Sequence, residues 1–115
     1  MMHSLKKYKI FIKPGSTDFR KAVNGLSEIV EDQMNEKLFE NSLFVFCNKS
    51  KDKLKILYWD DTGFCLWYKR LEKNKFPWPK TEKEKQIITY KELQMLLKGI
   101  DFFNVHEKIT FSSVI

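Results

Sequence analysis

The segment KLKILYWDDTGFCLWYKRLEKNKFPWP, which runs from Lys53 to Pro79, decides the fold. Its parts KLKILYW and FCLWYKRL each alternate between two sets of side chains, as successive residues of a β-strand do. Between them lies DDTG, a tight-turn sequence in which Gly63 is available for a positive φ. EKNK predicts a second turn, and FPWP predicts a short edge segment because Pro77 cannot donate a ladder hydrogen bond. The segment therefore predicts an antiparallel hairpin followed by an edge piece.

Two more strands and two helices surround this hairpin. SLFVFC is apolar throughout, which is typical of a central strand covered on both faces, and KYKIFIK alternates like a first strand. Apolar residues at helical spacing predict an amphipathic helix over residues 18–34, with Ser16 or Thr17 as its cap. In TYKELQMLLKGI, Thr89 and Glu92 have the spacing of a capping box, so a second helix is expected there.

The predicted architecture is α+β: a small antiparallel β-meander of three to four strands plus an N-terminal strand, packed with two helices. At 115 residues the chain is long enough for one core, and we expect a single domain over residues 1–103. Residues 104–115 are expected to be a C-terminal tail that could form a short strand.

The composition indicates a basic protein that is not inserted into a membrane. It has 21 Lys and Arg against 15 Asp and Glu, a net charge of +6, which favours encounter with nucleic acid, acidic proteins or an anionic membrane surface. The longest apolar runs are strand-length, far below the roughly 20 residues of a spanning helix. Cys47 and Cys65 lie in apolar segments and are expected to be reduced, buried thiols of a cytoplasmic protein.

The acidic residues do not predict an active site. The carboxylates considered for a two-metal site are those of Asp18, Asp60, Asp61 and Glu72. Asp18 suits a helix start, and acidic residues in a turn such as DDTG usually serve backbone geometry. Both histidines lie in terminal segments, and the four glycines do not form a phosphate-binding loop. We therefore expect no catalytic residues, no metal site and no cofactor.

Two lysine-rich turns predict a nucleic-acid-binding edge. They are NKSKD, the first turn of the meander, and EKNK, its third turn after DDTG. Because the first and third turns of a meander fall at the same end of the sheet, their charges would merge and bind phosphates without reading bases. The residues of this predicted edge are Lys49, Lys51, Lys53, Lys55, Lys69, Arg70, Lys73 and Lys75. Trp59 and Trp67 either belong to the core or present rings for base stacking if their face is exposed.

A protein-binding surface is the alternative. Trp78 stands between two prolines and is expected to be rigid and partly exposed, like the anchors of binding hot spots. Arg20 and Lys21 are expected to line the same surface. The competing interpretation is that Trp78 folds back onto the second helix as part of the core.

Four stretches, STDFRKAVNGL, LFVFCNKSKDKLKILYWDDTGFCLWYKRLE, FPWP and LLKGID, together resemble one family. They are similar to the TnpB accessory proteins of bacterial insertion sequences of family 66, over about residues 10 to 102. These proteins share only a name with the RNA-guided nuclease TnpB. The resemblance implies a cytoplasmic protein needed for transposition, with the transposase of the same element as its partner and element DNA as a further candidate.

These observations predict a non-catalytic accessory factor for DNA transposition, which assists the transposase by binding DNA through the basic sheet edge. The alternative is a protein–protein adaptor that binds the transposase without contacting DNA.

Overall fold

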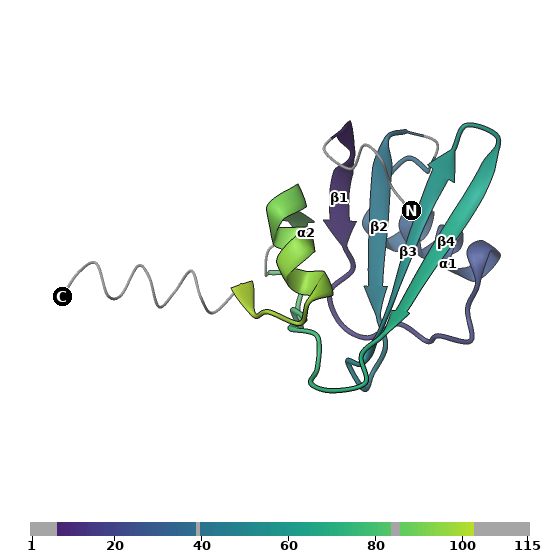
Figure 1. The fold of residues 1–115 in the computed structure, drawn as a ribbon. Coiled ribbons are helices and arrows are strands. Elements are labelled where there is room, and N and C mark those ends of the chain that lie inside the picture. The colour runs from purple at the N-terminus through teal and green to yellow at the C-terminus, as the bar shows by residue number, and fades with distance from the viewer. Residues whose placement is uncertain (1–6, 39, 84–85, 103–115) are drawn as a thin grey trace.

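A five-stranded mixed sheet forms the centre of the protein, in the order β4-β3-β2-β1-β5 (Figure 1). Strands β2 (Ser42–Cys47), β3 (Lys53–Asp60) and β4 (Gly63–Arg70) form an antiparallel meander. Strand β1 (Lys9–Ile12) pairs parallel to β2, and the two-residue strand β5 (Ile87–Ile88) pairs antiparallel to β1. The predicted α+β meander with an added N-terminal strand is therefore confirmed.

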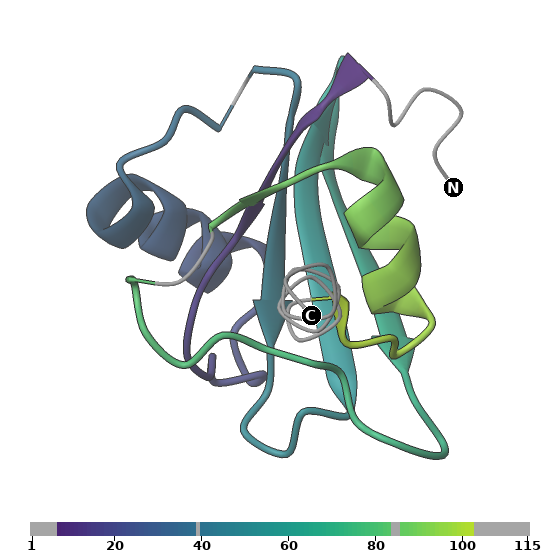
Figure 2. The same cartoon turned by 90° about the vertical axis from the view of Figure 1, so that its left-hand side faces the viewer.

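The computed structural model describes residues 7–38, 40–83 and 86–102. Helix α1 (Val23–Ile29) continues directly into η2 (Val30–Met34), a π-helical turn, and together they cover one face of the sheet. Helix α2 (Tyr90–Leu97) covers the other face, so the sheet lies between two helical layers (Figure 2).

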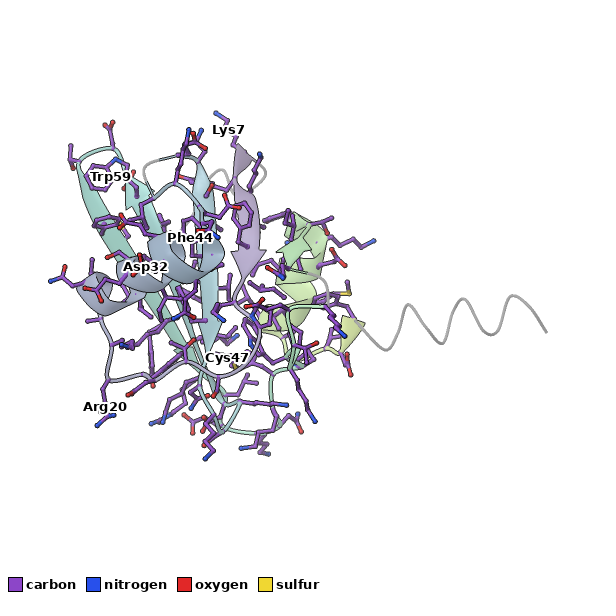
Figure 3. The ribbon with its side chains drawn as sticks, turned by 180° about the vertical axis from the view of Figure 1, so that it is seen from behind. Lys7, Arg20, Asp32, Phe44, Cys47 and Trp59 are labelled. Carbon is purple, nitrogen blue, oxygen red and sulfur yellow. The ribbon has the colours of Figure 1, made fainter. Side chains whose placement is uncertain are left out.

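The core lies on both faces of β2, whose six residues are all buried, as predicted for a central strand. On the side of α1, Phe44 lies beneath the helical segment that carries Asp32 (Figure 3). The buried residues of this side are Phe11, Leu26, Ile29, Val30, Leu38, Phe44, Phe46 and Leu57. The side of α2 buries Ile10, Ile12, Leu43, Val45, Leu54, Ile56, Ile88, Leu93 and Leu96, among others.

The first helix starts later than its pattern predicts. It begins at Val23 after Ala22, with no side-chain cap, so the predicted start at residue 18 and the predicted caps are wrong. The preceding segment is held against the sheet instead: Thr17 is buried, and its N–H donates to the carbonyl of the last residue of β2 at 2.8 Å. Asp18 accepts a hydrogen bond from the N–H of Arg20 at 2.9 Å, which closes a local turn in competition with the helix.

Two further predictions, one for the DDTG turn and one for the FPWP edge segment, are wrong. Asp61, rather than Gly63, adopts the left-handed conformation in the β3–β4 turn, with φ 53°. The FPWP segment is not a strand, and Phe76 and Trp78 are buried in the core on the α2 side. Beyond β1, the edge of the sheet is β5, which sequence analysis missed because two residues give no alternation.

The capping box of α2 is present as predicted. The N–H of Glu92 donates to the hydroxyl of Thr89 at 3.1 Å, and the N–H of Thr89 donates to the Glu92 carboxylate at 2.9 Å. The strand suggested within residues 104–115 lies outside the described residues. Within the described ranges, the helices are too short and too polar to span a bilayer.

Candidate nucleic-acid interface

Two turns meet at the end of the sheet where β2 ends and β3 begins. The N–H of Leu71 donates to the carbonyl of Asp52 at 2.7 Å, and the N–H of Phe76 donates to that of Lys51 at 2.7 Å. Both turns lie at the lower end of the sheet in Figure 1. The prediction that the first and third turns of the meander share one end is confirmed, because backbone hydrogen bonds join them.

The β2–β3 turn is built around the side chain of Asn48. Its amide donates to the carboxylate of Asp52 at 2.7 Å, and its oxygen accepts from the N–H groups of Asp52 and Lys53 at 3.1 and 3.0 Å. The hydrogen bond from Asn48 lowers the pKa of Asp52, as do the nearby charges of Lys53 and Lys75. Lys51 takes a left-handed conformation with φ 59°. This network fixes the backbone that carries the first group of lysines.

We call the charged end of the sheet the basic rim, formed by Lys49, Lys51, Lys53, Arg70, Lys73 and Lys75. Only two acidic side chains, those of Asp52 and Glu72, lie within the same turns. The Arg70 guanidinium pairs with Glu72 at 2.8 Å. In the described part of the chain the five rim lysines make no ion pair within 4.0 Å. The rim therefore has a surplus of positive charge exposed to solvent.

Lys55 and Lys69 were predicted to belong to the charged edge, but they are not part of the basic rim. The ammonium of Lys55 donates to the carbonyls of Phe19 and Lys21 at 3.0 and 2.9 Å, and it lies 4.9 Å from the centre of the Phe19 ring. Burial lowers the pKa of Lys55. On the opposite face of the sheet, the ammonium of Lys69 donates to the carbonyl of Leu97 at 2.8 Å. Lys55 therefore joins the segment before α1 to β3, and Lys69 joins the end of α2 to β4.

Arg20 and Lys21 lie near the rim, since Lys55 holds their segment against β3. Figure 3 places Arg20 toward the same end of the sheet as Cys47, away from Lys7 and Trp59. The Arg20 side chain is 92% exposed and contacts the Asp18 carboxylate at 2.7 Å. This pairing lowers the pKa of Asp18 to about 2.

Trp78 is not the exposed anchor that its flanking prolines suggested. It is only 7% exposed, and its indole N–H donates to the carbonyls of Lys13 and Gly15 at 3.0 and 2.9 Å. The adjacent backbone also pairs, because the N–H of Gly15 donates to the carbonyl of Pro79 at 2.9 Å. Trp78 therefore joins the segment after the basic rim to the turn after β1, and the competing interpretation as core is correct.

The other two tryptophans point to opposite faces of the sheet. Trp59 is paired with Phe64 across β3 and β4, and their rings meet edge-on at 5.0 Å. Trp67 packs against the core on the α2 side. They do not share a face and cannot form one stacking platform. Tyr68, which was not among the predicted site residues, is 49% exposed and lies opposite Lys55. The alternation of side chains along FCLWYKRL could have indicated that Tyr68 lies on the same face as Arg70.

The carboxylates considered for catalysis are dispersed. Asp18 pairs with Arg20, Glu72 pairs with Arg70, and Asp60 and Asp61 lie at the β3–β4 turn, the end of the hairpin opposite the rim. A group of three residues able to hold a metal ion is not found among the residues that the structure describes.

The cysteines are not bonded to each other. Cys47 is fully buried, and burial raises the pKa of its thiol to about 12. Cys65 is only partly buried.

These features define a small α+β domain in which a mixed sheet lies between two helical layers and carries a positively charged rim at one end. Residues 8–107 match the family of IS66 Orf2-like proteins, and the chain belongs to this family.

Two relatives of the chain come from Sinorhizobium fredii (strain NBRC 101917 / NGR234). Protein y4hO is 33% identical over 107 residues, 93% of each chain, and y4jC is 31% identical over 100 residues, 87% of this chain and 86% of the relative. Both carry the description "uncharacterized protein". No solved structure matches the chain.

Proposed function

We propose that this protein is a non-catalytic accessory factor for transposition of an IS66-type element, and that it assists the transposase by binding DNA through the basic rim. Family membership associates the chain with IS66 transposition. The observation that supports the DNA contact is the joining of two lysine-bearing turns by backbone hydrogen bonds. When the backbone of two turns is already fixed by hydrogen bonds, their lysines lose less conformational freedom on binding phosphates than lysines on separate, mobile loops.

The expected mode of binding is contact with the phosphate backbone. Lysine ammonium groups neutralise phosphates and release counterions, so affinity should fall steeply with salt and depend little on base sequence. Arg20 and Lys21 extend the positive surface beyond the rim on the side of α1. Lys55 and Lys69 are left out of the proposed contact, since their ammonium groups are bound to main-chain carbonyls.

The adaptor alternative has less support. Its proposed anchor, Trp78, is buried and hydrogen-bonded, so it is not available to a partner without unfolding of the loop. Of the partner-binding residues that were predicted, only Arg20 and Lys21 remain exposed.

Fluorescence anisotropy with labelled duplexes, one from an element end and one random, tests the proposal at several salt concentrations. The rim variant carries Lys49→Gln, Lys51→Gln and Lys75→Gln. A matched control carries Lys7→Gln, Lys9→Gln and Lys91→Gln, which removes the same charge from exposed lysines away from the rim.

The rim variant should lose roughly tenfold or more in affinity, and its salt slope should fall by about 2 to 3, because each phosphate contact contributes about 0.9. The control should change little. Absence of wild-type binding at low salt, or equal losses in the two variants, would refute the proposed DNA contact.

A further inference from the structure

The β4 strand forms a long edge of the sheet. It is the outermost strand on its side and has eight residues, whereas β5 at the other edge has two. Over Phe64–Tyr68 it carries no proline and no charged residue, the devices that usually prevent edge strands from pairing with other chains. In the described ranges no strand pairs with its outer side.

The register shows which main-chain groups face outward. The hydrogen bond from the N–H of Leu71 to the carbonyl of Asp52 continues the β3–β4 ladder, in which bonded and non-bonded pairs alternate. The residues paired as Ile56–Trp67 and Leu54–Lys69 are therefore the bonded ones. Leu66 and Tyr68, which alternate with Trp67 and Lys69 along β4, direct their N–H and C=O groups away from β3.

The side chains at this edge are apolar and accessible on the side of α1. Leu66 is partly buried against the core on that side, and Tyr68 is 49% exposed. A strand added at the edge would cover the Tyr68 ring as well as pair the outward main-chain groups.

Charge at the two ends of β4 selects the direction of the added strand. Asp60 and Asp61 precede the strand at the β3–β4 turn. At its other end Lys69, Arg70 and Lys73 outnumber the single acid Glu72, which pairs with Arg70. An identical strand in antiparallel orientation brings the acidic end of each copy against the basic end of the other. A parallel copy would place like charges together, which is unfavourable.

We propose that the β4 edge binds the β4 edge of a second copy of this chain, antiparallel and about a two-fold axis at Trp67. In this register Leu66 of each copy faces Tyr68 of the other, and such a pair exchanges both main-chain hydrogen bonds. The turn at Asp61 then lies beside Lys73 of the second copy. Two five-stranded sheets become one continuous sheet, with the basic rims at opposite ends.

Sedimentation velocity at increasing protein concentration tests this interface. The wild type should shift from 13.8 kDa toward twice that mass. Tyr68→Pro should remain monomeric, because it removes an outward N–H while Trp67 and Lys69 keep theirs for the β3 ladder. The matched control Tyr68→Thr keeps the outward N–H and a strand-forming residue, so it should still dimerise. A wild type that is monomeric at every concentration would overturn the proposal, and so would loss of dimer in both variants alike.

A second measurement needs no variant and covers the case in which Tyr68→Pro does not fold. Wild-type protein, mixed from unlabelled and ¹⁵N-labelled preparations, is coupled with a carbodiimide, which joins lysine amines to carboxylates in contact. Mixed-isotope peptides should link Lys73 to Asp60 or Asp61. Mixed-isotope links only between other sites would overturn the register. Since the rim variant leaves β4 and Lys73 intact, failure of DNA binding and failure of dimerisation are distinguishable.

Discussion

Replacement of Trp78 by phenylalanine tests whether this residue is structural. The indole N–H donates to the carbonyls of Lys13 and Gly15, and the side chain is only 7% exposed. The variant keeps one aromatic ring but removes the donor for both carbonyls and leaves space where the second ring was. A net hydrogen bond contributes about 1 kcal/mol, and buried groups left without a partner add a further cost of about 1–3 kcal/mol.

The free energy of unfolding should therefore fall by about 2–3 kcal/mol for Trp78→Phe. This is less than the cost of about 3–5 kcal/mol for deletion of a whole aromatic side chain, because the variant keeps one ring. For a domain of this size that corresponds to a decrease in Tm of roughly 10–20 °C. Urea unfolding followed by circular dichroism measures the change. Trp59→Phe is the matched control, because Trp59 is only partly buried, and it should cost less than about 1 kcal/mol.

A Trp78→Phe variant with wild-type stability would refute this assignment. It would mean that the indole hydrogen bonds do not hold the segment after the basic rim to the turn after β1. A variant that is stable but fails to recover the transposase from a lysate would instead restore the exposed-anchor interpretation.

Two further predictions concern Lys51 and Cys47. Lys51 has φ 59°, so Lys51→Gly should leave stability unchanged or raise it by up to about 1 kcal/mol. The same variant should weaken DNA binding and reduce the salt slope by about 1; unchanged binding would remove Lys51 from the contact. Burial raises the pKa of Cys47 from 9.0 to about 12, so the unfolded chain loses this proton first and stability should fall as pH rises from 9 toward 12. Cys47→Ala should show a shallower alkaline loss in urea unfolding; an equal slope would contradict the assignment.

The strands of the meander were predictable because their signal is local. Alternation along KLKILYW and FCLWYKRL predicted two strands joined by the DDTG turn, and the structure pairs these strands from Lys53–Arg70 to Asp60–Gly63. The capping box of Thr89 and Glu92 is likewise a pattern within four residues. The convergence of the two basic turns was also predictable, since a meander returns alternate turns to one end of the sheet.

What sequence analysis missed depends on contacts between distant segments. The start of α1 is delayed because Thr17 is hydrogen-bonded to β2 and Lys55 holds the carbonyls of Phe19 and Lys21, interactions that helical periodicity does not contain. The indole of Trp78 is hydrogen-bonded to Lys13 and Gly15, which precede it in the chain by 65 and 63 positions. Nothing in the FPWP sequence shows whether such acceptors will be present.

The distribution of charge along the β3–β4 hairpin connects the two proposals. Asp60 and Asp61 lie at one end and the rim lysines at the other, so the acids do not neutralise the rim of their own chain. In the proposed dimer the acids meet Lys73 of the second copy, while Lys49, Lys51 and Lys75 remain available to phosphates. Main-chain pairing of β4 responds weakly to salt, whereas phosphate contacts weaken steeply as salt rises. Raising the salt concentration should therefore release DNA before it separates the dimer, and the reverse order would show that the dimer depends on charge rather than on the sheet edge.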